Sequence, residues 1–132
     1  MTGTRIPCVG GIIRDETGRL LLIKRGHDPE AGRWSLPGGR VEPGETDAEA
    51  LIRELREETG LAVLPGPLVG AVTRPGRGEA VLDIRDYSGT VTGGRLAAGD
   101  DAADVRWVSP GDVPGLPLTT GLAETLSSWG VI

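Results

Sequence analysis

Short runs of apolar residues recur along this 132-residue chain and predict its β-strands. The first two runs span residues 8–14 and 20–24. They flank Asp15-Glu-Thr-Gly18, whose turn-forming residues predict a hairpin. Later runs span residues 61–73, 80–87, 91–92 and 105–108. We expect Pro65-Gly66-Pro67 to break the first of these, and Ser88-Gly89 separates the next two.

Residues 47–59 show helical spacing instead. Thr46 and Glu49 form a capping box at the start, and Gly60 suits the left-handed position that ends a helix. One stripe of the helix is predicted to pack on a sheet, since its residues recur at helical spacing. The stripe consists of Ala48, Leu51, Ile52, Leu55 and Thr59.

A second helix is predicted near the end of the chain, capped by Thr119 or Thr120, running to about Trp129 and stopped by Gly130. Strands, a helix, more strands and a final helix indicate an α/β (α+β) fold with a mixed β-sheet between helices. The length of 132 residues fits one domain over 1–132, because such a chain buries one core.

The net charge of -5 and the pI near 4.9 argue against electrostatic binding to nucleic acid or to an anionic membrane. No apolar run reaches the roughly 18 residues that span a bilayer, and the N-terminal residues lack a signal-peptide pattern. We therefore expect a cytoplasmic protein. Cys8, the single cysteine, is interpreted as a buried small apolar residue, with a catalytic thiol as the alternative.

The predicted central helix carries Glu54, Glu57 and Glu58 within one arc beside its apolar stripe. Like charges at this spacing repel each other. A solvated acidic face relieved by Arg53 and Arg56 would explain them without any function. Three carboxylates on adjacent turns also form a hard, oxygen-rich site that suits Mg²⁺ or Mn²⁺, and such an ion would offset the repulsion.

The chain resembles the Nudix hydrolase family over residues 39–61. It reads Gly39, five residues, Glu45, seven residues, Arg53-Glu54-Leu55, one residue, Glu57-Glu58, one residue, Gly60-Leu61. These 9 specified positions within 23 residues match the Nudix box, and Trp34-Ser-Leu-Pro-Gly-Gly39 resembles the family's approach to it. The resemblance implies an α/β/α sandwich.

The resemblance also implies roles for residues of the box. Glu57 and Glu58 would be the principal metal ligands, with the Gly38 carbonyl as a further ligand and Glu54 as a ligand or the general base. Arg53 would orient the carboxylates, as its spacing from Glu57 and Glu49 suggests, and Glu45 would support them or touch a second metal. The catalytic set is thus Glu54, Glu57 and Arg53, and the metal set is Gly38, Glu54, Glu57, Glu58 and Asp104.

Asp104 enters because several family members recruit an acid from a loop before a late strand, which here is the segment 99–104. Asp101 and Asp100 are the other candidates, and an acidic surface turn explains each of them equally well. Arg25, Trp34 and Thr119 are the predicted substrate-binding residues, with Thr120 beside the last. A solvated Arg25, a packed Trp34 and a helix-capping Thr119 are the structural alternatives. Asp83 or Arg85 could face the pocket, depending on the strand register.

The function implied is metal-dependent hydrolysis of a pyrophosphate bond in a small-molecule nucleotide. The substrate would be a nucleoside triphosphate, or ADP-ribose or a related nucleoside diphosphate sugar. Arg106 stands where some triphosphate-cleaning members have Glu, which favours the sugar slightly. The alternatives are a non-catalytic nucleotide sensor and a structural Ca²⁺ site. Homodimers are common in the family, although no apolar stripe here demands one.

Overall fold

The computed structural model describes residues 3–99 and 101–132, which form two β-sheets and two α-helices. The strand orders are β4-β1-β6-β5 and β3-β2-β7. The first sheet is mixed, since β1 runs parallel to β6 and antiparallel to β4. In chain order the elements are β1 (Arg5–Ile13), β2 (Leu20–Arg25), β3 (Trp34–Ser35), β4 (Gly38–Arg40), α1 (Asp47–Thr59), β5 (Leu61–Pro75), β6 (Val81–Gly94), β7 (Ala102–Val108), the 3-10 helix η1 (Pro110–Gly115) and α2 (Leu122–Ser128).

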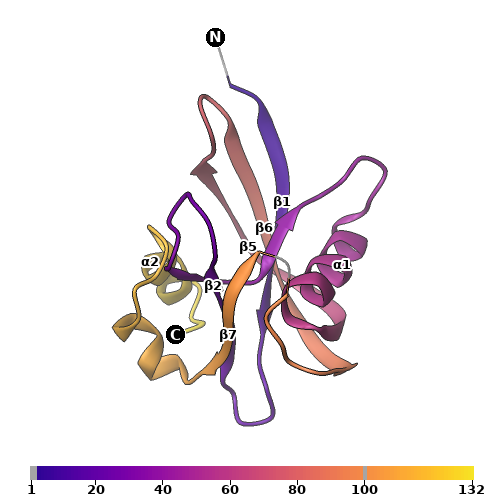
Figure 1. Cartoon of the computed structure of the whole chain (residues 1–132), viewed down its shortest axis with the longest axis vertical. Helices are drawn as coiled ribbons and strands as arrows, with labels where there is room; N and C mark the ends of the chain where they lie inside the picture. The colour runs from indigo at the N-terminus through magenta and orange to yellow at the C-terminus, as the bar shows by residue number, and fades with distance from the viewer. Residues whose placement is uncertain (1–2, 100) are drawn as a thin grey trace.

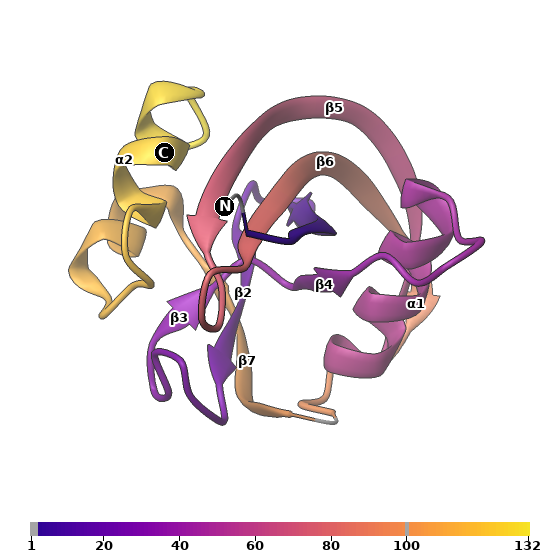
Figure 2. The same cartoon turned by 90° about the horizontal axis from the view of Figure 1, so that it is seen from above.

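Helices α1 and α2 lie on opposite sides of the strands (Figure 1, Figure 2). Each covers its own apolar core. On β2, Leu21 packs in the core beneath α1, whereas Leu20 and Leu22 pack in the core beneath α2. Ile13 and Ile12 of β1 divide in the same way, because successive side chains of a strand point to opposite faces. The expected α/β/α sandwich with a mixed sheet is confirmed.

Helix α1 has the predicted bounds and caps. Thr46 accepts a hydrogen bond from the Glu49 amide, the Glu49 carboxylate accepts one from the Thr46 amide, and Gly60 has a φ of 76°. Its buried face differs from the predicted stripe. Leu51, Leu55 and Thr59 are buried, but Ala48 and Ile52 are exposed. The buried face is rotated away from Ile52 toward Glu54 and Glu58, and this rotation brings both acids into the molecule.

The predicted strand breaks are wrong. Residues 61–75 form the single strand β5, and 81–94 form the single strand β6. β5 absorbs Pro65-Gly66-Pro67 through shifts in its register with β6. It can do so because β5 lies at the edge of its sheet, where a proline without an N–H group removes no hydrogen bond to an outer strand.

The predicted hairpin forms only at its turn. The Gly18 amide donates to the Asp15 carbonyl at 3.0 Å, and a single bridge joins Arg14 to Leu20. Beyond that point β1 and β2 diverge into different sheets. The two apolar runs are buried on both faces, so each strand needs a sheet neighbour of its own and a core on either side.

Helix α2 is shorter than predicted and begins at Leu122 without a side-chain cap. Gly121, with a φ of 84°, precedes it. Thr120 instead donates its hydroxyl and its amide to the Glu30 carboxylate, at 2.6 and 2.9 Å. The threonine that was expected to cap the helix therefore ties it to the loop between β2 and β3. No helix in the described part of the chain is long and apolar enough to cross a membrane.

Candidate active site

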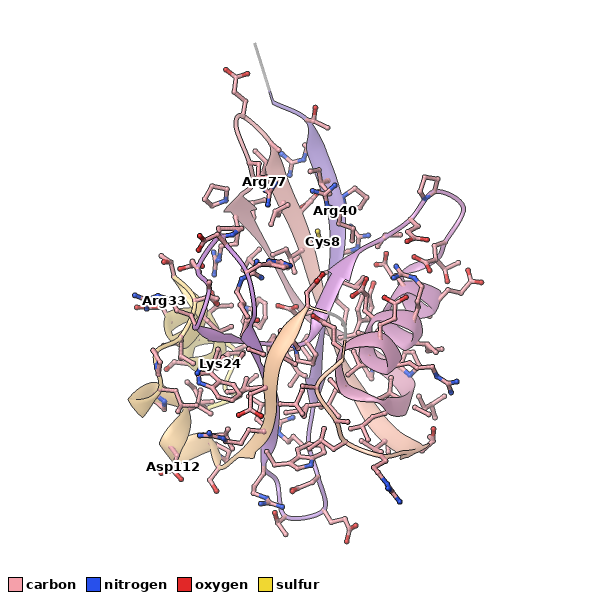
Figure 3. All side chains as sticks on the ribbon, in the orientation of Figure 1. Cys8, Lys24, Arg33, Arg40, Arg77 and Asp112 are labelled. Carbon is pink, nitrogen blue, oxygen red and sulfur yellow. The ribbon has the colours of Figure 1, made fainter. Side chains whose placement is uncertain are left out.

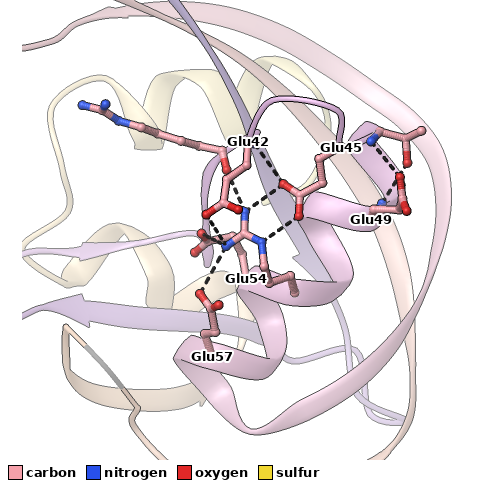
Figure 4. Close-up of polar contacts among 8 residues, drawn as sticks. Glu42, Glu45, Glu49, Glu54 and Glu57 are labelled. Carbon is pink, nitrogen blue, oxygen red and sulfur yellow. Dashed lines mark hydrogen bonds and ion pairs between the residues drawn. The ribbon is translucent and has the colours of Figure 1, made fainter.

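Arg53 organises the acidic face of α1 (Figure 4). Its guanidinium donates to both carboxylate oxygens of Glu45, at 2.7 and 2.9 Å, and to the carbonyl of Arg40 at 3.0 Å. It also donates to Glu54 at 2.7 Å and to Glu57 at 3.2 Å. Only the planar five-donor guanidinium group can serve this many acceptors at once. The predicted contact to Glu49 is wrong, because that carboxylate is used in the capping box.

These hydrogen bonds shift the pKa values of Glu45 and Arg53 so that both side chains stay charged. Hydrogen bonds from Arg53 hold the pKa of Glu45 down at about 2, so Glu45 is ionised at all ordinary pH values. Hydrogen bonding to Glu45 raises the pKa of Arg53 in turn. Glu45 is thus a fixed anion that positions Arg53, and Arg53 positions Glu54 and Glu57.

Glu58 lies on the other side of the cluster and is not held by Arg53. Its carboxylate accepts a hydrogen bond of 2.7 Å from the amide of Gly38, at the start of β4. Burial raises the pKa of Glu58 to about 8, although the Gly38 amide and the nearby charge of Arg25 oppose this rise. A buried carboxyl of this kind is costly to ionise unless a cation accompanies it.

Glu54 packs directly on the glycine pair that precedes the helix. A Cβ atom at Gly39 would lie 2.6 Å from the Glu54 carboxyl carbon, so only glycine lets this side chain rest on the backbone. Burial raises the pKa of Glu54, and its hydrogen bond from Arg53 opposes the rise.

A Gly39→Ala variant tests this packing. We expect a loss of activity of at least about tenfold with little loss of stability, because the added methyl meets a flexible carboxylate that can move, but only by leaving its place. Hydrolysis rates and thermal unfolding should be measured together. Gly93→Ala is the matched control, since a Cβ there meets no atom within 4 Å. Full activity in Gly39→Ala would show that the position of Glu54 does not matter.

The donor set suits a hard divalent ion, and the arrangement assembles part of such a site. Glu54 and Glu58 line one cleft together with Gly38 and Gly39. Glu57 turns toward Arg53 and does not line this cleft. Among residues 3–99 and 101–132, no three acidic, histidine or cysteine side chains converge as a ready metal site. Completing the set requires the Glu57 side chain to change its rotamer.

Two adjoining clefts meet at these residues. The smaller, of about 420 Å³, holds Glu54 and Glu58, and the larger, of about 860 Å³, extends from the glycine pair toward α2. Arg25 lines both and Thr119 lines the larger, so two of the three predicted substrate-binding residues have access to a ligand. Cys8 is buried beneath the clefts, and burial raises the pKa of its thiol.

Three further arginines, which were not predicted, also reach the clefts. Arg77, on the β5–β6 loop, lines both of them, Arg74 lines the larger and Arg40 lines the smaller. Arg77, Arg40 and Cys8, which all line the smaller cleft, lie near one another in Figure 3. Cationic side chains at its rim suit a polyanionic ligand. In the sequence, Arg74 directly precedes Pro75-Gly76 and Arg77 directly follows it, and this placement beside a turn could have indicated both residues.

Trp34 lies elsewhere. Only 4% of its surface is exposed, it packs in the core beneath α2, and it lines neither cleft. The guanidinium of Arg106 lies 4.8 Å from the centre of a Trp34 ring. This placement corresponds to the packing alternative and leaves no ring face for a base. Arg106 packs on Trp34 and lines neither cleft.

The acidic segment 99–104 runs into β7, and of its described residues one acid lines a cleft. Asp101 lines the smaller cleft and lies 3.4 Å from the His27 ring. Asp104 lines neither cleft. Its carboxylate accepts a hydrogen bond from the Val105 amide and lies 3.8 Å from Arg106. The structure thus places Asp101, rather than Asp104, beside the carboxylates of α1. Asp100 lies outside the described residues.

The register of β6 decides which of its side chains face the larger cleft. Asp83 pairs with Arg5 at 3.4 Å, and Arg85 binds Asp47 at the start of α1, at 2.6 Å through its Nη2 atom. Neither lines a cleft. The alternate residues do, and one of them is Asp86, which was not predicted. The sequence could have indicated Asp86, because it follows Leu82 and Ile84 at intervals of two residues and so shares their face of the strand.

Comparison with known proteins agrees with this architecture. A family model described as the NUDIX domain matches residues 4–128. "Putative 8-oxo-dGTP diphosphatase" of Bacillus subtilis is 41% identical over 104 residues, 78% of this chain and 66% of that protein. "ADP-ribose pyrophosphatase" of Methanocaldococcus jannaschii is 41% identical over 113 residues, 82% of this chain and 64% of that protein.

Among solved structures, the MutT protein of Methanosarcina mazei superimposes with a TM-score of 0.87 at 28% identity, covering 98% of this chain and 96% of the other. The chain spans about two thirds of the length of the two curated relatives above. The match to the family model nevertheless covers nearly every residue, including the box, the glycine pair and both helices. The chain belongs to the Nudix hydrolase family.

Proposed function

We propose that this protein hydrolyses the pyrophosphate bond of a nucleoside diphosphate linked to another group, with Mg²⁺ as its cofactor and Mn²⁺ as a substitute. The observation that supports this most is the shared cleft of Glu54, Glu58 and the Gly38–Gly39 backbone, continuous with a larger cleft edged by arginines. The names of its relatives, a diphosphatase and a pyrophosphatase, support the same reaction.

In this proposal Glu57, Glu58 and the Gly38 carbonyl would hold the metal ion. The bound cation would supply positive charge against the phosphates and make water easier to deprotonate. Glu54 takes the proton of the attacking water as the new P–O bond forms and the bridging P–O bond breaks. Its placement on Gly39, its position in the cleft and its raised pKa suit that task. Asp101 is the second candidate for the base, because it lines the same cleft.

The remaining charged residues position the catalytic carboxylates and the substrate. Arg53 keeps Glu54 in place without touching substrate, and Glu45 keeps Arg53 in place. Glu57 would leave its hydrogen bond to Arg53 when it turns to the metal ion. Arg25 and Arg77, which line both clefts, are suited to contact the phosphates. An acidic protein can then hold an acidic substrate through the metal ion and these arginines.

Two leaving groups agree with the proposal, namely pyrophosphate from a nucleoside triphosphate and a sugar phosphate from a compound such as ADP-ribose. Arg106 does not favour the sugar, because it stacks on Trp34 outside the clefts. A panel of both substrate types with Mg²⁺ separates the two by product. Triphosphates release inorganic pyrophosphate, whereas sugar compounds release monoesters that yield orthophosphate only after phosphatase treatment. No turnover of any panel member would contradict the proposal.

The pH dependence of stability offers a prediction that needs no substrate. The folded-state pKa of Glu58, about 8, lies above its ordinary value, so the folded protein holds this proton more tightly than the unfolded chain does. The resulting contribution to the unfolding free energy is present at low pH and is lost as pH rises through about 8. Between pH 7 and 9 the metal-free protein should lose about 1 kcal/mol of unfolding free energy from this group.

Thermal unfolding in a chelator and in Mg²⁺, at pH 7 and 9, measures this effect. Because Mg²⁺ binds the ionised carboxylate, it should raise the melting temperature more at pH 9 than at pH 7. Asp86, whose pKa is raised to about 6, has largely finished titrating below this range. In Glu58→Gln both the pH dependence and the Mg²⁺ effect should shrink. Equal pH dependence in the two proteins would contradict the assignment.

A further inference from the structure

Asp86 is a buried carboxylate without a protein partner. Only 4% of its surface is exposed, yet no side-chain or backbone group among residues 3–99 and 101–132 donates a hydrogen bond to it. In those residues, every side-chain oxygen or nitrogen that is completely shielded from solvent has a hydrogen-bond partner. The oxygens of Asp86 have none, so they must be accessible from the cleft that Asp86 lines. Most buried carboxylates have their hydrogen bonds satisfied by the protein.

The surrounding residues are arranged to admit this side chain. Gly10 of β1 pairs with Asp86, and a Cβ at Gly10 would lie within 2.1 Å of the Asp86 Oδ1 atom. The missing side chain therefore leaves the space that the carboxylate fills. Burial raises the pKa of Asp86 to about 6, and the nearby charge of Arg74 opposes the rise. The group is therefore still largely ionised at neutral pH, when it only accepts hydrogen bonds.

Asp86 lies two strands from Gly38, because Gly10 pairs with both residues. It lines the larger cleft, whereas Glu54 and Glu58 line the smaller one. On β5 and β6 the cleft has an apolar surface formed by Val72, Leu82 and Ile84, and its polar lining residues include Arg74 and Thr125. A pocket with apolar surface and a small number of placed polar groups is the usual form of a small-molecule site.

Arg74 also lines the larger cleft, but it is engaged elsewhere. Its Nη2 atom donates to the Thr125 hydroxyl at 2.7 Å and to the Gly121 carbonyl at 3.2 Å, which joins β5 to the start of α2. A ligand, rather than this arginine, is thus left to supply the donors that Asp86 lacks.

We propose that Asp86 selects the base of the nucleotide by accepting two hydrogen bonds from the ring N–H and the amino group of guanine or a guanine derivative. This inference rests on the proposed function, since it assigns the base end of the same site. Two adjacent donors match the two oxygens of one carboxylate. Adenine and cytosine place an acceptor beside their amino group, and uracil has a single N–H donor, so each leaves an oxygen of Asp86 unpaired.

Asp86→Asn provides the test, because the amide has the same shape but offers one acceptor and one donor. Binding of GMP, AMP, CMP and UMP should be measured in a chelator by calorimetry or NMR titration, so that hydrolysis plays no part. The wild-type protein should prefer GMP by at least about tenfold. In the variant GMP binding should weaken by roughly 10- to 100-fold, and AMP and CMP should bind better than in the wild type, since an amide pairs with both the donor and the acceptor of adenine or cytosine.

Asp83→Asn is the matched control. It lies on the same strand, lines neither cleft, and should leave the order of the four nucleotides unchanged. The melting temperature of Asp86→Asn should be equal to or above that of the wild type, because an unpaired buried charge has been removed.

An unchanged order of bases in Asp86→Asn would overturn the proposal. So would a fall in melting temperature with equal weakening of all four nucleotides, which would show that Asp86 serves the fold by facing Arg74. If the base preference switches in a protein that hydrolyses no substrate, the assignment of the base end stands and the proposed hydrolysis fails.

Discussion

Replacing Glu58 with glutamine is expected to lower the rate of pyrophosphate hydrolysis by about 100-fold or more while the protein stays folded. Glu58 combines a place in the smaller cleft, a hydrogen bond from the Gly38 amide and a pKa raised to about 8 by burial. Glutamine keeps the shape and an acceptor for Gly38 but removes the negative charge. Loss of even an outer partner of a metal ligand costs 10- to 100-fold, so loss of a ligand should cost more.

The measurement is steady-state hydrolysis at several Mg²⁺ concentrations, together with thermal unfolding. We expect the fold to remain intact, since an uncharged side chain is easier to bury than a carboxylate. Glu49→Gln is the matched control on the same helix, because its side chain serves only the capping box, which glutamine also completes. Activity unchanged in both Glu57→Gln and Glu58→Gln would reject the catalytic assignment.

The same experiment distinguishes the other hypotheses for this site. A nucleotide sensor would bind its ligand with no turnover in the wild type. A structural Ca²⁺ site would show metal-dependent melting without hydrolysis.

Replacing Arg53 with alanine is expected to damage both activity and stability. The guanidinium serves Glu45, Glu54 and Glu57, and its own side chain is 25% exposed. Without it, like-charged carboxylates remain close together, with Glu45 and Glu54 mostly shielded from solvent and Glu57 exposed. We expect a loss of about 2–3 kcal/mol in unfolding free energy, below the 3–5 kcal/mol of a fully buried pair. Activity should fall at least about 100-fold, since Glu54 and Glu57 lose their common anchor.

Arg53→Lys separates charge from geometry. Lysine restores the charge but has a single ammonium group, so it cannot reach all three carboxylates and the Arg40 carbonyl. It should recover part of the stability but little of the activity. Urea unfolding and hydrolysis rates measure the two effects, and Arg56→Ala, at an exposed position of the same helix, is the control. Full activity in Arg53→Lys would show that the geometry of the guanidinium is not required.

The sequence by itself was sufficient to predict helix α1, its caps and the presence of three acids along it. These features depend on residues within four positions of one another, and local spacing determines them. The apolar runs that became the strands could be read in the same way. The α/β/α sandwich followed from their order and from the family resemblance, whereas the sequence indicated a single core and the described residues form two.

Only the tertiary structure decided which of these acids reach the cleft. The apolar stripe suggested that Ile52 is buried, but the packing of α1 against β1, β4 and β5 turns Glu54 and Glu58 inward instead. The partners of Arg53 include Glu45 and Arg40, 8 and 13 residues away, at distances no helical spacing predicts. The course of the chain before α1, which brings them there, is a property of the fold.

The register of β6 was the other feature that only the tertiary structure determined. Side chains on a strand alternate between faces, so a shift of one residue exchanges Asp83 and Arg85 for Asp86 in the cleft. Pairing with β1, far away in the sequence, and with the preceding strand β5 sets that register. The sequence alone thus determined the helix that carries the proposed metal site. The fold determined the wall that faces the base, because that wall depends on pairing between distant strands.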